Sequence, residues 1–115
     1  RGMDFAPVAN WRLFREAVRV FEERTTPFRA GGILSSDTFY HDDPDHWKVW
    51  ADHGVLAIEM ETNQLYTLAA RYGVEALSIL TVSDSLISGK ELSAEDRQTS
   101  FHEMAQAALE IAIRR

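Results

Sequence analysis

Short apolar runs that alternate with amphipathic segments are the feature that most constrains how this chain folds. Three segments are predicted as strands: 29–35, 55–58 and 76–82. Four segments repeat apolar residues at helical spacing: 11–21, 47–51, 65–72 and 101–112. This alternation predicts an α/β fold with a mostly parallel or mixed central sheet flanked by helices. Three strands make a small sheet, so we expect the chain to be part of a larger domain.

Residues at the segment ends predict where the helices start and stop. Asn10 and Ser93 have side-chain oxygens that accept hydrogen bonds from first-turn amides, so helices are expected to begin directly after them. Gly54 and Gly73 are expected to end the second and third helices. The last helix is predicted to bury a stripe of apolar residues: Phe101, Met104, Ala105, Ala108, Leu109 and Ala112.

Charge and cysteine content exclude several classes of protein. The chain has 115 residues, with 12 Lys and Arg against 18 Asp and Glu, which gives a net charge of −6. A binder of nucleic-acid phosphates needs a clustered basic surface instead. The absence of cysteine rules out disulfides, thiolate zinc sites and a cysteine nucleophile within the chain. No apolar stretch approaches the roughly 20 residues of a membrane span, so we expect a cytoplasmic protein that binds neither nucleic acid nor membrane.

The ends of the predicted strands carry most of the polar candidates for a site. Ligands of open α/β sheets bind beyond the carboxyl ends of the strands. Phe39, Glu59, Glu61 and Asp84 follow the three strands and are therefore expected to share one rim. Paired carboxylates can accept hydrogen bonds from the two hydroxyls of a vicinal diol. Two simpler interpretations stay open: carboxylates that stabilise a helix start, and an aspartate in a turn.

Arg97 is a second candidate because of its position on the last helix. It precedes Phe101 by four residues and so continues the predicted buried stripe. A buried arginine needs a carboxylate partner or a cleft, and Asp84 is the natural candidate. The alternative is an arginine that extends outward into solvent at the end of the helix.

Two further patterns do not predict a site. A cluster of metal-ligating types lies in one turn: His41, Asp42, Asp43, Asp45 and His46. It lacks an established ligand spacing, so a solvated acidic turn is expected and no metal is predicted. Gly31 and Gly32 are not followed by a helix, so they do not form a phosphate-binding loop.

Four motifs resemble those of a known enzyme family. Residues 57–62 (AIEMET) resemble the "VEMEA" strand end of the nucleoside phosphorylase superfamily, and residues 80–84 (LTVSD) resemble the "TVSD" segment of its bacterial hexameric purine-specific branch. Residues 93–101 (SAEDRQTSF) are similar to "AAERQTTF", and residues 35–40 (SSDTFY) to "SADLFY". Thr62 and Ser85 depart from the family's usual Ala and His. Together the motifs cover essentially the whole chain in the family's order.

The resemblance implies that residues 1–115 are the C-terminal half of a single nucleoside phosphorylase domain with a partial nucleoside phosphorylase fold. The implied activity is reversible phosphorolysis of purine nucleosides in purine salvage, by a homohexamer with inorganic phosphate as co-substrate and no cofactor. The family's glycine-rich phosphate loop, its phosphate-binding arginines and a histidine from a neighbouring subunit belong to the other half. The 115-residue chain alone is therefore expected to be inactive.

The resemblance also implies a role for each matched residue. Asp84 would be the general acid that protonates purine N7, and Arg97 would assist it. The other implied roles are substrate binding by Phe39 on the base, Ser83 beside the base, Glu61 on the ribose hydroxyls, and Glu59 and Met60 around the sugar. Two alternatives remain: a nucleosidase of the same superfamily that uses water, and a non-catalytic fragment that binds nucleosides or assembles with partners.

Overall fold

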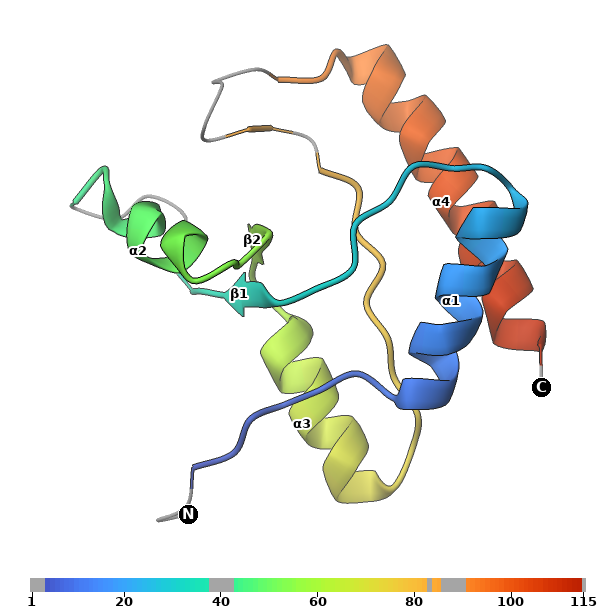
Figure 1. The fold of residues 1–115 in the computed structure, drawn as a ribbon, viewed down its shortest axis with the longest axis horizontal. Helices are drawn as coiled ribbons and strands as arrows, with labels where there is room; N and C mark the ends of the chain where they lie inside the picture. The colour runs from blue at the N-terminus through green and yellow to red at the C-terminus, as the bar shows by residue number, and fades with distance from the viewer. Residues whose placement is uncertain (1–3, 38–42, 83, 86–90, 115) are drawn as a thin grey trace. The chain divides into compact units, whose positions relative to one another are not determined.

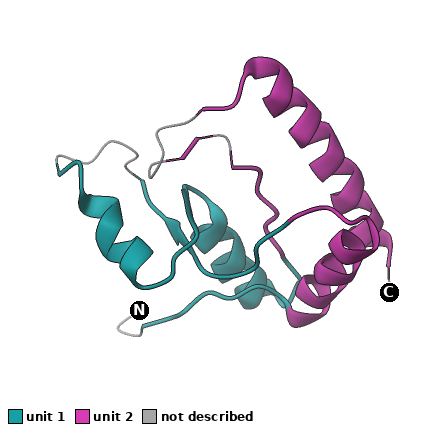
Figure 2. Ribbon diagram, turned by 45° about the horizontal axis from the view of Figure 1, so that its top comes forward, with its two compact units in different colours: residues 1–10, 28–76 teal, residues 11–27, 77–115 magenta. Residues whose placement is uncertain are grey.

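The α/β class predicted from the sequence is confirmed by a computed structural model, which describes residues 4–37, 43–82, 84–85 and 91–114. The helices and strands within these residues are α1 (Trp11–Glu23), β1 (Ile33–Ser35), α2 (His46–Asp52), β2 (Ala57–Glu59), α3 (Thr62–Tyr72) and α4 (Ala94–Ile113), shown in Figure 1. They belong to two compact units (Figure 2): residues 1–10 with 28–76, and residues 11–27 with 77–115. None of the described helices combines the length and hydropathy needed to cross a membrane.

The first unit contains a parallel pair of strands. Ile33 pairs with Ala57, and Ser35 with Glu59, while α2 forms the connection between the two strands. The first strand is shorter than predicted, because its glycine-containing start is irregular. A Cβ added to Gly31 would lie 2.9 Å from Leu56 Cδ1. Gly31 is therefore where the chain passes closely over a neighbouring side chain.

Glycine ends the helix that follows the second strand, as predicted. α3 stops at Tyr72, and Gly73 adopts the left-handed conformation with φ of +67°. The amide of Val74 then donates to the carbonyl of Ala69 at 3.0 Å. This closing geometry satisfies carbonyls that the helix itself leaves without partners.

The second unit is built on the contact between α1 and α4. Its core consists of Ala17, Val20, Ala107 and Ile111, and Val20 is completely buried. The predicted stripe on α4 is wrong in part: Met104, Ala105 and Ala108 are half-buried, whereas Phe101 and Leu109 are 62% and 69% exposed. The fully buried positions of α4 are Ala107 and Ile111, which lie outside that stripe and belong to the contact with α1.

The third predicted strand is not formed. Residues 76–82 are all described, and they run as an irregular segment without a strand assignment. Leu77 and Ile79 pack instead against the core between α1 and α4. The apolar run is thus used for side-chain packing, while a strand would also require a neighbouring strand for its backbone hydrogen bonds.

An ion-pair network that the sequence did not predict joins the ends of α1 and α4. Glu110 accepts hydrogen bonds from Arg24 at 2.7 Å and from Arg114 at 2.8 Å, and Arg114 also donates to Glu23 at 2.6 Å. The hydrogen bond from Arg24 is the main cause that lowers the pKa of Glu110, and Arg114 likewise lowers the pKa of Glu23. The network adds electrostatic contacts to the apolar core of this unit.

Candidate functional site

The carboxyl ends of the two parallel strands carry a network centred on Glu59. The register places Ser35 beside Glu59, and the Ser35 hydroxyl donates to Glu59 Oε1. Glu59 Oε2 accepts the amide of Glu61 at 2.8 Å and the amide of Thr62 at 2.7 Å. The amide of Asn63 donates to Ser35 Oγ at 2.9 Å. Two strand-end side chains thus satisfy three consecutive amides at the start of α3.

The network keeps Glu59 ionised. Partial burial alone would raise the pKa of this carboxyl by desolvation. The hydrogen bonds from the Ser35 hydroxyl and from the amides of Glu61 and Thr62 together outweigh desolvation, and the pKa lies below its ordinary value. For Glu59, the interpretation as a residue that stabilises a helix start therefore describes what its carboxylate does in this structure.

Glu61 differs from Glu59 in having an exposed carboxylate. It occupies the N-cap position of α3, and its side chain makes no capping hydrogen bond. Within the described part of the chain, only its main chain is engaged, through Glu59 and through the amide of Leu65. Met60 beside it is 41% exposed. Of the two carboxylates in this motif, Glu61 is the one available to a ligand.

Acid is expected to weaken the start of α3. Because the pKa of Glu59 is lower in the folded than in the unfolded protein, its contribution to the unfolding free energy is complete above about pH 4.3, the unfolded value. It is lost as the pH falls through the lower folded pKa. At neutral pH, Glu59→Gln should reduce the unfolding free energy by about 1 kcal/mol, as loss of a helix cap does. Urea unfolding between pH 3 and pH 7 measures both effects.

The matched control for this prediction is Glu61→Gln. It removes one carboxylate from the same helix start, but one whose side chain makes no capping hydrogen bond. Its effect on the unfolding free energy should be much smaller than that of Glu59→Gln. Equal effects of the two variants, or a Glu59→Gln effect that does not decrease as the pH falls from 7 to 3, would contradict the prediction.

The second unit contains the predicted pair of Asp84 and Arg97. Arg97 Nη2 lies 3.2 Å from Asp84 Oδ1. The arginine stands in the first turn of α4, where its amide donates to the carbonyl of Ser93. Ser93 caps this helix as predicted, because its hydroxyl accepts the amide of Asp96 at 3.0 Å. The cap therefore fixes the turn from which Arg97 reaches Asp84.

Burial is not the reason for this pairing. The side chains of Asp84 and Arg97 are 55% and 47% exposed, so the expectation of a buried arginine is wrong for this structure. An ion pair this exposed contributes only about 0–1 kcal/mol to stability. Its position next to solvent leaves both groups accessible to a ligand.

The predicted site residues do not all lie in one described unit of the structure. Phe39 and Ser83 lie outside the described residues. Glu59, Met60 and Glu61 belong to the first unit, whereas Asp84 and Arg97 belong to the second. The common rim of Phe39, Glu59, Glu61 and Asp84 therefore stays a prediction. Ser35 was missed as a member of the site, although it lies at a predicted strand end and is the first residue of the matched motif 35–40.

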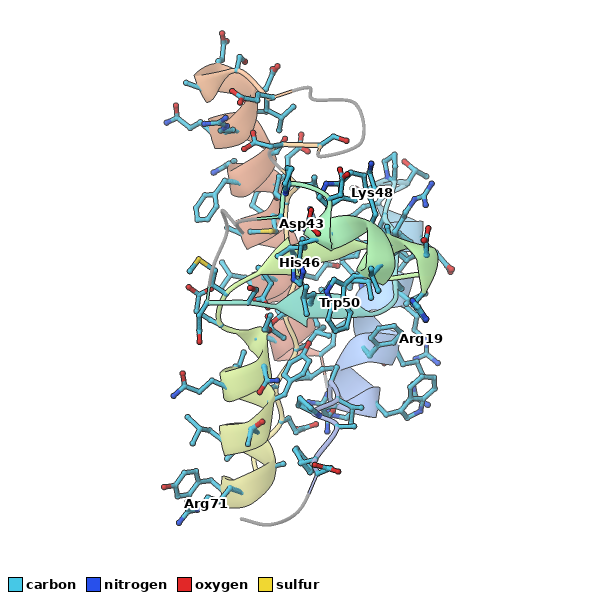
Figure 3. The ribbon with its side chains drawn as sticks, turned by 90° about the vertical axis from the view of Figure 1, so that its left-hand side faces the viewer. Arg19, Asp43, His46, Lys48, Trp50 and Arg71 are labelled. Atoms are coloured by element: carbon cyan, nitrogen blue, oxygen red, sulfur yellow. The ribbon has the colours of Figure 1, made fainter. Side chains whose placement is uncertain are left out.

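The described residues of the acidic turn form hydrogen bonds and an ion pair at the start of α2. Asp43 accepts the amide of Asp45 on its side chain at 2.9 Å and the amide of His46 on its carbonyl at 3.1 Å. Asp45 also forms an ion pair with Lys48 at 2.9 Å. Figure 3 shows Asp43, His46 and Lys48 around α2. His41 and Asp42 lie outside the described residues, and among the others there is no group of three candidate metal ligands.

Comparison with known proteins identifies the family of this chain. The model of the phosphorylase superfamily matches residues 2–114. A DeoD-type purine nucleoside phosphorylase of Caldanaerobacter subterraneus subsp. tengcongensis is 57% identical over 111 residues, which are 96% of this chain and 48% of the relative. Proteins of the same description from Geobacillus sp. (strain WCH70) and Clostridium novyi are 52% and 50% identical, over 99% and 96% of this chain and 48% of each relative. The chain thus spans about half the length of these curated relatives, and it belongs to the phosphorylase superfamily.

Proposed function

We propose that the protein containing this chain is a purine nucleoside phosphorylase. It would convert a purine ribonucleoside or deoxyribonucleoside and inorganic phosphate into the free base and the pentose 1-phosphate. The observation that carries the proposal is the ion pair of Asp84 and Arg97 at 3.2 Å, in which an exposed carboxylate is held by a first-turn arginine. The relatives, which are named purine nucleoside phosphorylases, support the choice of substrate class.

In the proposed reaction, Asp84 is the general acid. A phosphate oxygen forms a bond to C1′ of the sugar while the bond from C1′ to the purine breaks and its electron pair moves to the base. Asp84, which enters this step in its protonated form, gives its proton to N7, so the base leaves as a neutral molecule. The guanidinium of Arg97 then stabilises the carboxylate that remains, which favours proton donation.

Nucleoside binding is assigned to five residues of the matched motifs. We propose that the exposed carboxylate of Glu61 accepts hydrogen bonds from the ribose hydroxyls, and that Glu59 and Met60 shape the sugar site. Phe39 would stack on the base, and Ser83 would line the base site. Phosphate would be bound by residues outside this chain, and the family resemblance extends the proposal to a homohexamer.

The products of inosine cleavage test the proposal. The complete protein is incubated with inosine, with and without phosphate, and the sugar product is identified. We expect ribose 1-phosphate, formed only when phosphate is present, and no cleavage by the 115-residue chain alone. Free ribose formed without phosphate would indicate a nucleosidase. Binding of inosine without cleavage would indicate a non-catalytic nucleoside-binding protein.

A further inference from the structure

The parallel register places Ser35 where it can act on Glu59. The two residues are partners in adjacent strands, so their side chains leave the sheet on the same face. The amide of Ser36 donates to the carbonyl of Glu59 at 2.8 Å, which ties the ends of the strands together. The Ser35 hydroxyl and the Glu59 carboxylate are therefore held next to each other by the backbone.

The hydrogen-bonding capacities of the two side chains fix the direction of their contact. An ionised carboxylate only accepts, so the single hydroxyl proton of Ser35 points to Glu59. The hydroxyl oxygen remains free to accept, and it takes the amide of Asn63 at 2.9 Å. The second carboxylate oxygen takes the amides of Glu61 and Thr62. One hydroxyl and one carboxylate thus bind the start of α3 to the ends of both strands.

The hydrogen bonds at the start of α3 hold the main chain of Glu61. Its amide is held by Glu59 at 2.8 Å and its carbonyl by Leu65 at 3.1 Å, while its carboxylate is exposed. The direction in which this carboxylate leaves the main chain depends on both of these hydrogen bonds. Thr62, the next residue, is 95% buried, so the main chain that follows Glu61 is held in place as well.

We propose that Ser35 and Glu59 are positioning residues that orient the Glu61 carboxylate toward the sugar hydroxyls of the nucleoside. This inference rests on the proposed function, because it assumes that Glu61 binds those hydroxyls. It assigns to Ser35 a role in selecting sugars that carry hydroxyls, and to Glu59 an indirect role through the main chain of Glu61. Neither residue needs to touch the substrate for this role.

Comparison of two nucleosides tests the proposal in the complete protein. Dissociation constants are measured by calorimetry for inosine and for 2′,3′-dideoxyinosine, which lacks the hydroxyls. The Ser35→Ala variant loses one hydrogen bond of the network. Its dissociation constant for inosine should therefore rise about 2- to 10-fold, which corresponds to roughly 0.5–1.5 kcal/mol. Dideoxyinosine binding should not change, and Ser35→Thr, which keeps the hydroxyl, should restore inosine binding. Equal weakening for both nucleosides would overturn the proposal.

A matched control lies on the same helix. The Thr67 hydroxyl donates to the carbonyl of Asn63 at 2.7 Å, a hydrogen bond within α3. Thr67→Ala removes a hydroxyl hydrogen bond from α3 and should leave both dissociation constants unchanged. In the background of Glu61→Gln, Ser35→Ala should weaken inosine binding no further. An additive loss in the double variant would mean that Ser35 acts on the nucleoside by another route.

Amide hydrogen exchange separates this proposal from the proposed function. In Ser35→Ala, the amides of Glu61, Thr62 and Asn63 should exchange faster, and those of α4 should not. Unchanged exchange at these three amides would overturn the positioning role whatever the nucleoside data. If the unmodified protein fails to bind inosine, the proposed function fails, and exchange still decides whether Ser35 holds the main chain of Glu61.

Discussion

Asp84→Asn in the complete protein is expected to lower kcat for inosine by about 10²- to 10⁴-fold, the usual contribution of a positioned general acid. The substitution keeps the shape of the side chain but removes the proton that would go to N7. Nucleoside binding should change far less, because protonation matters mainly as the bond to the base breaks. Steady-state kinetics at saturating phosphate, with a separate measurement of inosine binding, gives both quantities.

The role of Asp84 can be separated from a structural one by changing the substrate. 7-Methylguanosine already carries a positive charge at N7, so its base leaves without a proton, and the defect of Asp84→Asn should nearly vanish. Arg97→Ala should show the same rescue, because the 3.2 Å ion pair joins it to Asp84. Asp96→Asn changes a carboxylate in the same helix turn and serves as the matched control. An equal defect with both nucleosides would mean that Asp84 is not the acid.

The helices were predicted well because their signals are local. Ser93 forms the expected cap of α4, α1 begins at Trp11 directly after Asn10, and Gly73 ends α3. Each of these features depends on residues within one turn of the helix end. The sequence around the end therefore contains all the information that the prediction needed.

The strands and the buried helix faces depend on distant partners, and here the predictions failed in part. Residues 76–82 have the composition of a buried strand, yet their Leu77 and Ile79 pack on α1 and α4 without a strand being formed. Contact with α1 determines which face of α4 is buried. Phe101 was predicted to lie on that face, but it is exposed. An apolar run indicates burial, whereas its hydrogen-bond partners are decided elsewhere in the chain.

The candidate site likewise combines a contact that follows from local sequence with one that depends on the pairing of distant strands. The pairing of Asp84 with Arg97 followed from helical spacing and proximity along the chain, and the structure contains it. The contact of Ser35 with Glu59 joins residues 24 positions apart and follows only from the register of the two strands. The residue pattern alone left open whether the carboxylates at positions 59 and 61 bind a diol or stabilise a helix start, and hydrogen bonding makes Glu59 a structural carboxylate and leaves Glu61 exposed.

Glu61→Gln in the complete protein is expected to weaken inosine binding and kcat/KM together, by about 10- to 150-fold. This range corresponds to loss of hydrogen bonds to a charged group, which contribute about 1.5–3 kcal/mol. The proposed contact with the ribose hydroxyls exists in the ground state and the transition state alike, so both quantities should fall by similar factors. Calorimetric dissociation constants and steady-state kinetics measure the two effects independently.

The hydroxyls themselves provide the control for Glu61. With 2′,3′-dideoxyinosine there is nothing for the carboxylate to hold, so Glu61→Gln should bind this nucleoside as well as the unmodified protein does. The exposed carboxylate makes no capping hydrogen bond, so the variant should also keep its unfolding free energy nearly unchanged. A loss of binding that is equal for inosine and its dideoxy analogue would mean that Glu61 does not recognise the sugar. The ribose contact would then have to come from a different residue, and the orientation imposed by Glu59 would have no bearing on sugar recognition.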